Sequence, residues 1–325
     1  MIWTSYTANA RLHLAVDDRT SWCPRGGREC METISNFDAK QCVARKPLIT
    51  KSGKTIPLFR IDSLYSLTQA VGYAKFLNGS SHDVFLRGQS VLYQRLYPSL
   101  FRQVQSARGM KRAMTCLSQF IAACRTNQVA FNDVPDDAHE PLLQHYGIRT
   151  KWIDLVDNLW VALWFGCHTC QVDRTGRDYV HFYARHKNDG NNASLFYILL
   201  VATDATQEDK WCPGFKKGPS TYVMDLRKAC PSMFLRPHAQ HAVLARHKNL
   251  DQYDDADLMD QVCGILEVTV ENGLSWLGSG NLLSVSNLFP PANYDYGYQR
   301  LLENVPVPST ASIRQTLGTI NLNFA

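Results

Sequence analysis

The stretch QHYGIRTKWID (144–154) runs into LWVALWFGCHTC (159–170), and these two segments locate the centre of the fold. The second segment is apolar on all sides, so we expect a helix buried against several other elements. Gly147 ends the preceding helix, and the strip after it places polar side chains beside the buried helix. Polar groups in such a position need partners. The strip is therefore either a set of structural caps or the floor of a site, and Asp154 suits both roles: capping the next helix or orienting a ligand ribose.

Outward from this centre, helices precede strands along the chain. Hydrophobic spacing predicts helices at residues 61–77, at 111–126, around 142–146 and after Tyr294. Strands are predicted at residues 83–89, 179–183, 194–202, 242–245 and 264–270. This order indicates an α+β fold rather than an alternating βαβ chain. The first 55 residues carry few aliphatic runs, and KPLITKSGK (46–54) resembles a basic linker. We therefore expect a small N-terminal unit, 1–55, and a domain, 56–325.

Two further stretches carry chemistry, FLRGQ (85–89) and LRPHAQ (235–240). In the first, the glycine would let the backbone of a ligand approach while the guanidinium of Arg87 clamps a phosphate. The alternative is a surface arginine before a turn. The second stretch adds Arg236 and Gln240, whose amide can donate to or accept from a nucleotide.

Taken in order, these stretches resemble the FRG domain family, named for its Phe-Arg-Gly signature. The family pattern is F-x-RGQ or FRGQ, then Q-H-Y-G-x-x-T-R-x-x-D-W-T with an A-L-x-F helix, then R-P-x-x-Q. The chain has FLRGQ, LLQHYGIRTKWIDLVDN with VALWF, and LRPHAQ, so the resemblance covers residues 60–304. It departs from the pattern at Arg149 (usually proline), at Lys151 (usually arginine) and at Leu155-Val156 (usually Trp-Thr).

The same segments are similar to ADP-ribosyltransferases of the Arg-Ser-Glu type, which implies a split β core with flanking helices and NAD as co-substrate. By this resemblance Arg87 grips the NAD phosphates, Tyr146 stacks on nicotinamide, and Thr150 and Asp154 position the ribose. Gln240 or Glu267 would occupy the late catalytic position, where a polar group stabilises an oxocarbenium-like centre; for Glu267 the alternative is an exposed strand residue. The expected catalytic residues are Arg87, Tyr146, Asp154, Gln240 and Glu267, and the expected cofactor-binding residues are Arg87, Gly88, Gln89, His145, Tyr146, Thr150 and Arg236.

The N-terminal unit contains a candidate zinc set of one imidazole and three thiols: His13, Cys23, Cys30 and Cys42. A structural zinc would stabilise a segment too short to form a core. The alternative is three unrelated cysteines and a surface histidine. The segment also resembles small zinc knuckles that contact nucleic acid, for which the basic residues of this unit would supply phosphate contacts.

Composition excludes several classes of protein. With 45% hydrophobic and 19% charged residues, the chain is neither disordered nor a coiled coil. It has no apolar run of membrane-spanning length, and the N-terminal residues lack the features of a signal peptide. Ten cysteines in 325 residues are too few for a disulfide framework, so we expect a cytoplasmic protein with no membrane partner. Cys167 and Cys170 are expected in the core rather than as a redox pair.

From these features we expect an NAD-dependent ADP-ribosyltransferase that acts on nucleic acid, with RNA favoured. It would be the toxin or effector of a bacterial toxin–antitoxin or anti-phage defence system, with an antitoxin protein as its partner. One alternative is a non-catalytic module that binds nucleotides or nucleic acid, and another is an ADP-ribosyltransferase that modifies protein. A nuclease built on His145, Asp154 and His238 is a third alternative.

Overall fold

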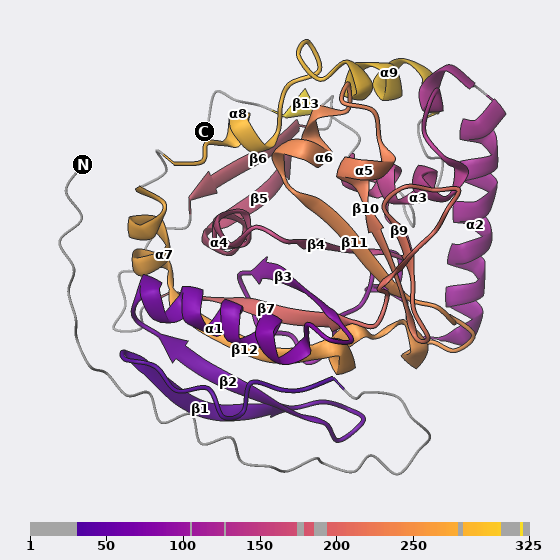
Figure 1. Ribbon diagram of the computed structural model, residues 1–325. Helices are drawn as coiled ribbons and strands as arrows, with labels where there is room; N and C mark the ends of the chain where they lie inside the picture. Colours follow the sequence, from indigo (N-terminus) through magenta and orange to yellow (C-terminus); the bar gives the residue numbers. More distant parts are fainter. Residues whose placement is uncertain are drawn as a thin grey trace. The chain divides into compact units, whose positions relative to one another are not determined.

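A ten-stranded mixed sheet runs through the part of the chain that the computed structural model describes, which comprises residues 31–104, 106–126, 128–173, 179–184, 194–278, 282–306 and 319–320 (Figure 1). In sheet order the strands are β1 (Cys42–Ile49), β2 (Thr55–Ile61), β12 (Val262–Thr269), β7 (Leu195–Thr203), β3 (Asp83–Gln89), β4 (Ile153–Val156), β11 (Ala242–His247), β10 (Thr221–Asp225), β9 (Phe215–Lys217) and β8 (Gln207–Glu208). Neighbouring strands are antiparallel except β2 and β12, which are parallel. A separate sheet joins β13 (Thr319–Ile320), β6 (Tyr179–Ala184) and β5 (His168–Asp173).

Helices cover this sheet and its edges. They are α1 (Leu64–Asn78), α2 (Ala107–Thr126), α3 (Asp136–His145), α4 (Leu159–Cys167), α5 (Leu226–Ala229), α6 (Leu235–Ala239), α7 (Val270–Trp276), α8 (Val285–Leu288) and α9 (Tyr296–Asn304), with single 3-10 turns η1 (Gln128–Phe131), η2 (Asp254–Ala256) and η3 (Leu258–Gln261). The α+β class is therefore confirmed.

Helix α4 lies at the centre, as its composition predicts. Val161, Ala162, Leu163 and Trp164 are buried, and they share one core cluster with α1 and with one face of β3, β7 and β12. The helix is capped by Asn158, whose Oδ1 accepts hydrogen bonds from the amides of Trp160 and Val161, at 2.9 and 3.3 Å. The expected cap, Asp154, instead lies within β4.

Two further clusters complete the core. The opposite face of the same strands is covered by Leu96, Leu258 and Met259. A third cluster packs α2, α3 and α9 against the β10–β11 end of the sheet. Gly147 ends α3 as expected: its φ of +104° lies in the region that favours glycine, and its amide donates to the carbonyl of Gln144 at 2.9 Å.

Most predicted elements are present with small changes in their ends, but three segments differ. Residues 168–170, expected at the end of the helix, begin β5. Strand β4 was not predicted. Residues 46–54 are not a linker, because they complete β1 and turn back into β2, with a register shift between Arg45 and Leu48. Backbone contacts divide the chain between Cys30 and Met31, so residues 31–55 belong to the same compact unit as the rest of the described chain.

No helix in the described ranges is long and apolar enough to cross a membrane. Cys167 is a buried free thiol, as expected for a core position.

Candidate functional site around Arg87

Strands β3 and β4 bring the two central motifs together. Leu86 of β3 lies opposite Val156 of β4. Next to this pair, Arg87 Nη1 donates a hydrogen bond of 2.6 Å to the carbonyl oxygen of Asp154, 67 positions further along the chain. The arginine and the polar strip that follows α3 therefore lie next to each other in the fold.

Two donors from β3 are unused. The Arg87 Nε and Gln89 Nε2 atoms are buried and have no hydrogen-bond partner among the described residues. Residues two apart in a strand project to the same side of the sheet, so both donors face the same region. A buried donor without a partner is costly, and an anionic oxygen of a ligand would satisfy both.

Burial and charge shape the chemistry of Arg87. Burial, reinforced by the nearby positive charge of Arg102, lowers the pKa of Arg87 to about 10. The negative charge of Asp154 acts in the opposite direction. The guanidinium stays charged at neutral pH. The Arg87 side chain forms no ion pair with a carboxylate among the described residues. This arrangement favours the binding of an external anion.

His145, the last residue of α3, lies beside the same carboxylate. Burial lowers its pKa to about 4, although the charge of Asp154 opposes this shift. The ring is therefore neutral at pH 7, and its buried Nε2 has no partner within the described chain. Asp154 itself is exposed. We call four residues the Arg87 cluster: the cation Arg87, the amide Gln89, the neutral imidazole His145 and the carboxylate Asp154.

Comparison with known families finds a match in this part of the chain. Residues 82–174 match the FRG domain. This FRG segment contains all four residues of the cluster, whereas the LRPHAQ stretch and Glu267 lie outside it. No curated protein and no solved structure matches the chain.

Within the FRG segment, Gly88 has a different role from the one expected. A Cβ atom at this position would lie 1.8 Å from the carbonyl oxygen of Ala162 and 2.9 Å from the amide nitrogen of Gly166. The backbone that approaches the glycine is that of α4, not that of a ligand. Gly88 therefore sets the packing of the helix on β3.

Tyr146 and Arg236 are structural. The Tyr146 ring is fully buried and stacks on Tyr298 with centroids 5.1 Å apart, and its hydroxyl donates to Asp295 Oδ2 at 2.6 Å. The Arg236 guanidinium, with the whole residue 5% exposed, lies 4.5 Å from the centroid of Tyr146 and 5.4 Å from that of Phe289. The expected stacking of nicotinamide on Tyr146 is therefore wrong, because neighbouring side chains already cover the ring. The Arg236 guanidinium is enclosed by the same aromatic rings, although its Nε and Nη2 atoms have no hydrogen-bond partner among the described residues.

Thr150 and Gln240 are also engaged in internal hydrogen bonds. The buried Thr150 hydroxyl donates to Gln144 Oε1 and accepts from the amide of Trp152 at 3.2 Å. The Gln240 Nε2 donates to the carbonyl oxygen of Leu288 at 2.7 Å, which ties the end of α6 to α8. These two residues hold the surroundings of the site in place.

Glu267 lies on the same side of the sheet as Gln89. The register places Tyr197 opposite Gln89 and Glu267 opposite Tyr197, so the three form a row across β3, β7 and β12. The backbones of the outer two strands are about 10 Å apart. The carboxylate of Glu267 is 13% exposed and forms an ion pair of 3.1 Å with Arg60. Glu267 is thus not the exposed strand residue of the alternative interpretation.

The expected zinc set lies mostly outside the described residues, since it includes His13, Cys23 and Cys30. Cys42 is in β1, where burial raises the pKa of its thiol. Among residues that the structure describes, no group of three or more His, Cys, Asp or Glu side chains is placed to hold a metal ion.

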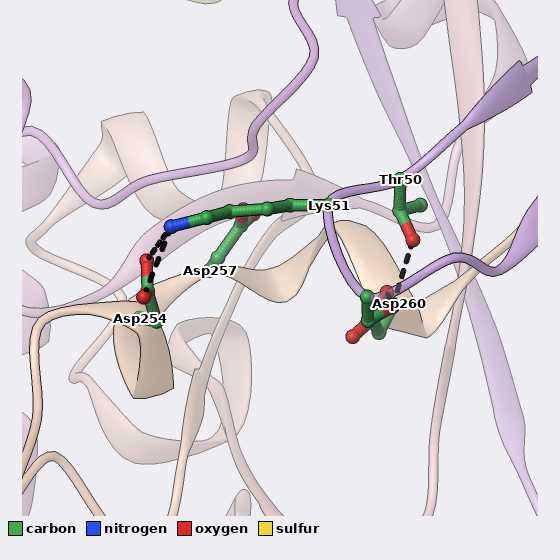
Figure 2. A pocket seen from close by; sticks show the side chains of 6 residues that line it. Thr50, Lys51, Asp254, Asp257 and Asp260 are labelled. Carbon is green, nitrogen blue, oxygen red and sulfur yellow. Dashed lines mark hydrogen bonds and ion pairs between the residues drawn. The ribbon is translucent and has the colours of Figure 1, made fainter.

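A separate pocket is lined by Thr50, Lys51, Ser52, Asp254, Asp257 and Asp260 (Figure 2). Figure 2 shows Lys51 reaching Asp254, at 3.1 Å. The other two carboxylates are also occupied: Asp257 accepts from the amide of Leu96 at 2.7 Å, and Asp260 accepts from Ser52 at 2.7 Å. The residues that line this pocket connect the β1–β2 turn to η2 and η3. Their carboxylates are therefore engaged in internal contacts.

Sequence reasoning missed three residues that shape the site. Asp295 accepts the Tyr146 hydrogen bond, Arg60 holds Glu267, and Arg102 modifies Arg87. Asp295 precedes a helix, and an aspartate in that position is a recognisable cap signal. Arg60 and Arg102 act only through tertiary contacts and carry no local signal.

Proposed function

We propose that the chain is an NAD-dependent ADP-ribosyltransferase with its site at the Arg87 cluster. The observation that carries the proposal is the pair of buried, unused donors on Arg87 and Gln89, with Arg87 hydrogen-bonded to the backbone carbonyl of Asp154 and influenced by the charge of that residue. The pyrophosphate of NAD offers anionic oxygens to both donors. We also propose that the core has the split β arrangement of ADP-ribosyltransferases.

The reaction needs stabilisation of positive charge on the ribose. The bond between ribose C1′ and nicotinamide breaks, and its electron pair leaves with nicotinamide. An oxygen or nitrogen of the acceptor then bonds to C1′ and releases its proton to a base. We assign Asp154 to the stabilisation of the oxocarbenium-like centre, because a carboxylate held beside developing positive charge lowers the barrier. Glu267, in the same row as Gln89, is the candidate base for the acceptor proton.

We further propose RNA as the acceptor, and a role as the toxin or effector of a toxin–antitoxin or anti-phage system, with an antitoxin as partner. The formal net charge of +5 is compatible with a polyanionic acceptor. We also propose that the protein is cytoplasmic and that its N-terminal unit binds a structural zinc.

The experiment measures release of nicotinamide from NAD and transfer of labelled ADP-ribose to RNA. We expect Arg87→Lys to lower kcat/KM about 10- to 100-fold, since a hydrogen bond to a charged group contributes about 1.5–3 kcal/mol. Arg246→Lys is the matched control, because Arg246 is another buried arginine with an unpartnered Nε and a lowered pKa, but it packs on Trp152 and Tyr222. If the wild-type protein releases no nicotinamide, the enzyme proposal is refuted.

A second candidate is a non-catalytic nucleotide-binding module. The observation that favours it is the ion pair of Glu267 with Arg60, which engages the candidate base. NAD binding measured by calorimetry, abolished by Arg87→Ala but unaccompanied by release of nicotinamide, would establish this alternative. Transfer of label to protein and not to RNA would retain the chemistry and change the acceptor.

A further inference from the structure

Helix α2 carries an unbalanced positive charge. It runs for 20 residues along one side of the described unit (Figure 1) and contains no Asp or Glu. Three of its basic residues, Arg108, Lys111 and Arg112, are exposed, and their side chains form no hydrogen bond or ion pair within the described chain. Arg125, by contrast, is engaged with α3: its Nη2 donates to the carbonyl oxygen of Asp136 at 2.9 Å.

The three free cations lie close together near the first turns of the helix. Positions 108 and 112 are four residues apart, so their side chains are neighbours on one face and repel each other. The N-terminal end of a helix also carries partial positive charge, and the first turn of α2 has no acidic residue to offset it. The described residues therefore supply no acidic side chain that pairs with this cluster, and an external anion would stabilise it.

The apolar face of α2 is not available to a partner. Met110, Ala113, Leu117, Phe120 and Cys124 are buried in the core cluster formed with α3 and α9. An amphipathic helix that binds a membrane surface inserts its apolar face, and α2 has none to insert. Beyond the cations, the outer face presents exposed Thr115, Ser118 and Gln119, which are hydrogen-bonding side chains. The surface thus suits a polar, highly charged polymer.

The loop before α2 connects the charge of this helix with that of Arg87. The loop before α2 carries Arg102 and Gln103, both exposed. Gln103 accepts a hydrogen bond of 3.1 Å from Arg149 Nη1, and Arg102 is close enough for its charge to act on Arg87. One exposed cation, Arg102, thus lies close in the chain to the start of α2 and near enough for its charge to act on Arg87.

We propose that the outer face of α2, with Arg108, Lys111 and Arg112, binds the phosphate backbone of a nucleic-acid strand. From position 108 to position 119 this face is about 16 Å long, which is enough for contacts with several successive phosphates. The direction of the nucleic-acid strand, toward Arg87, rests on the proposed transferase function. The binding of the strand to α2 does not depend on that function.

The test measures the binding of a short fluorescein-labelled single-stranded RNA by anisotropy over a series of salt concentrations. The variant R108A/K111A/R112A preserves helix propensity, because alanine is the best helix former. We expect it to weaken binding at least about tenfold at moderate salt and to lower the slope of log K against log salt by roughly 2. The control K75A/K210A/K248A removes the same charge from exposed lysines in α1, after β8 and after β11, and we expect binding close to that of the wild type.

Three results would overturn the inference: no binding of RNA or single-stranded DNA by the wild type, equal losses in the two triple variants, or binding of polyglutamate as tight as that of RNA. Parallel RNA and DNA series show which backbone is preferred. Release of nicotinamide from NAD is measured on the same samples. Loss of RNA binding with unchanged release supports the docking surface, whereas absence of release in the wild type refutes the transferase and leaves the RNA result standing.

Discussion

Arg87 and Gly88 are adjacent in the chain and serve different purposes. The side chain of Arg87 presents a donor that the described chain leaves unused. The missing side chain of Gly88 admits the backbone of α4. A two-residue motif thus combines a buried donor without a partner with the packing that fixes its position.

The packing role of Gly88 can be measured. We expect Gly88→Ala to lower the free energy of unfolding by more than about 3 kcal/mol or to prevent folding, because the new Cβ would overlap the carbonyl oxygen of Ala162 and the backbone of α4 cannot yield cheaply. Urea denaturation gives the value. The control is Gly72→Ala in α1, where no atom lies within 4 Å of the added Cβ and where alanine should stabilise the helix by about 0.5–1 kcal/mol. Equal stabilities for the two variants would contradict this role.

His145 makes stability depend on pH. The pKa of this residue falls from its ordinary 6.5 to about 4 on folding. Between these values the unfolded chain binds the proton and the folded chain does not, so the free energy of unfolding decreases as the pH falls from about 6.5 to about 4. The full effect is at most about 3 kcal/mol. We expect the variant His145→Gln to lose this part of the pH dependence in urea melts, and superimposable slopes for variant and wild type would refute the assignment.

At the scale of elements, the residues after α8 form an anchor for two motifs. Asp295 is fully buried and accepts hydrogen bonds from the Tyr146 hydroxyl, from the Arg236 amide at 3.1 Å and from the Tyr298 amide at 2.9 Å. It therefore caps α9 and also joins α3 to α6. Tyr146 of the QHYG motif and Arg236 of the LRPHAQ motif therefore join these elements through Asp295.

The strength of this anchor distinguishes it from an ordinary cap. We expect Asp295→Ala to cost about 3 kcal/mol or more of unfolding free energy, since it removes a cap and leaves buried donors without an acceptor. Ser284→Ala is the matched change at α8, where the capping side chain is partly exposed and the expected cost is about 1 kcal/mol. Thermal and urea melts of both variants provide the comparison, and a cost for Asp295→Ala no larger than that for Ser284→Ala would argue against the anchor.

The elements that the sequence predicts well are those whose burial is periodic or complete. α4 is apolar throughout, and β7 is a nearly continuous apolar run, so each is evident locally. The segment predicted as a linker, 46–54, contains the second half of β1, whose residues are mostly exposed and show no alternation of apolar and polar side chains. β4 has only four residues, and its strand character depends on pairing with β3 and β11.

The candidate site shows the same division. The contact between Arg87 and the strip at Asp154 could be predicted, because the motifs occur in a recognisable order. The roles of Tyr146, Arg236 and Gly88 could not, because a motif residue that holds the fold and one that binds a ligand look alike in a sequence. Burial and partners separate them, and both depend on residues far away in the chain, such as Asp295 and Ala162.

For the whole molecule, metal binding and the stability of the main unit should be separable. The described residues hold no cluster suited to a metal ion, and three of the four expected zinc ligands precede Met31. We expect a chelator to remove zinc from the purified full-length chain, as seen with a colorimetric zinc assay, while the main thermal transition measured by calorimetry keeps its midpoint. Collapse of that transition on chelation would show that the sheet itself depends on the metal.

The register shift in β1 has a consequence for the fate of the protein at high concentration. A terminal strand with free amides and carbonyls is a template on which another chain can add a strand, and this is a common start of aggregation. The shift in β1 coincides with Arg45, Lys46 and Pro47, two cations and a residue that has no amide hydrogen to donate. These three residues discourage edge-to-edge growth from that side of the sheet, and so they favour a chain that stays dispersed.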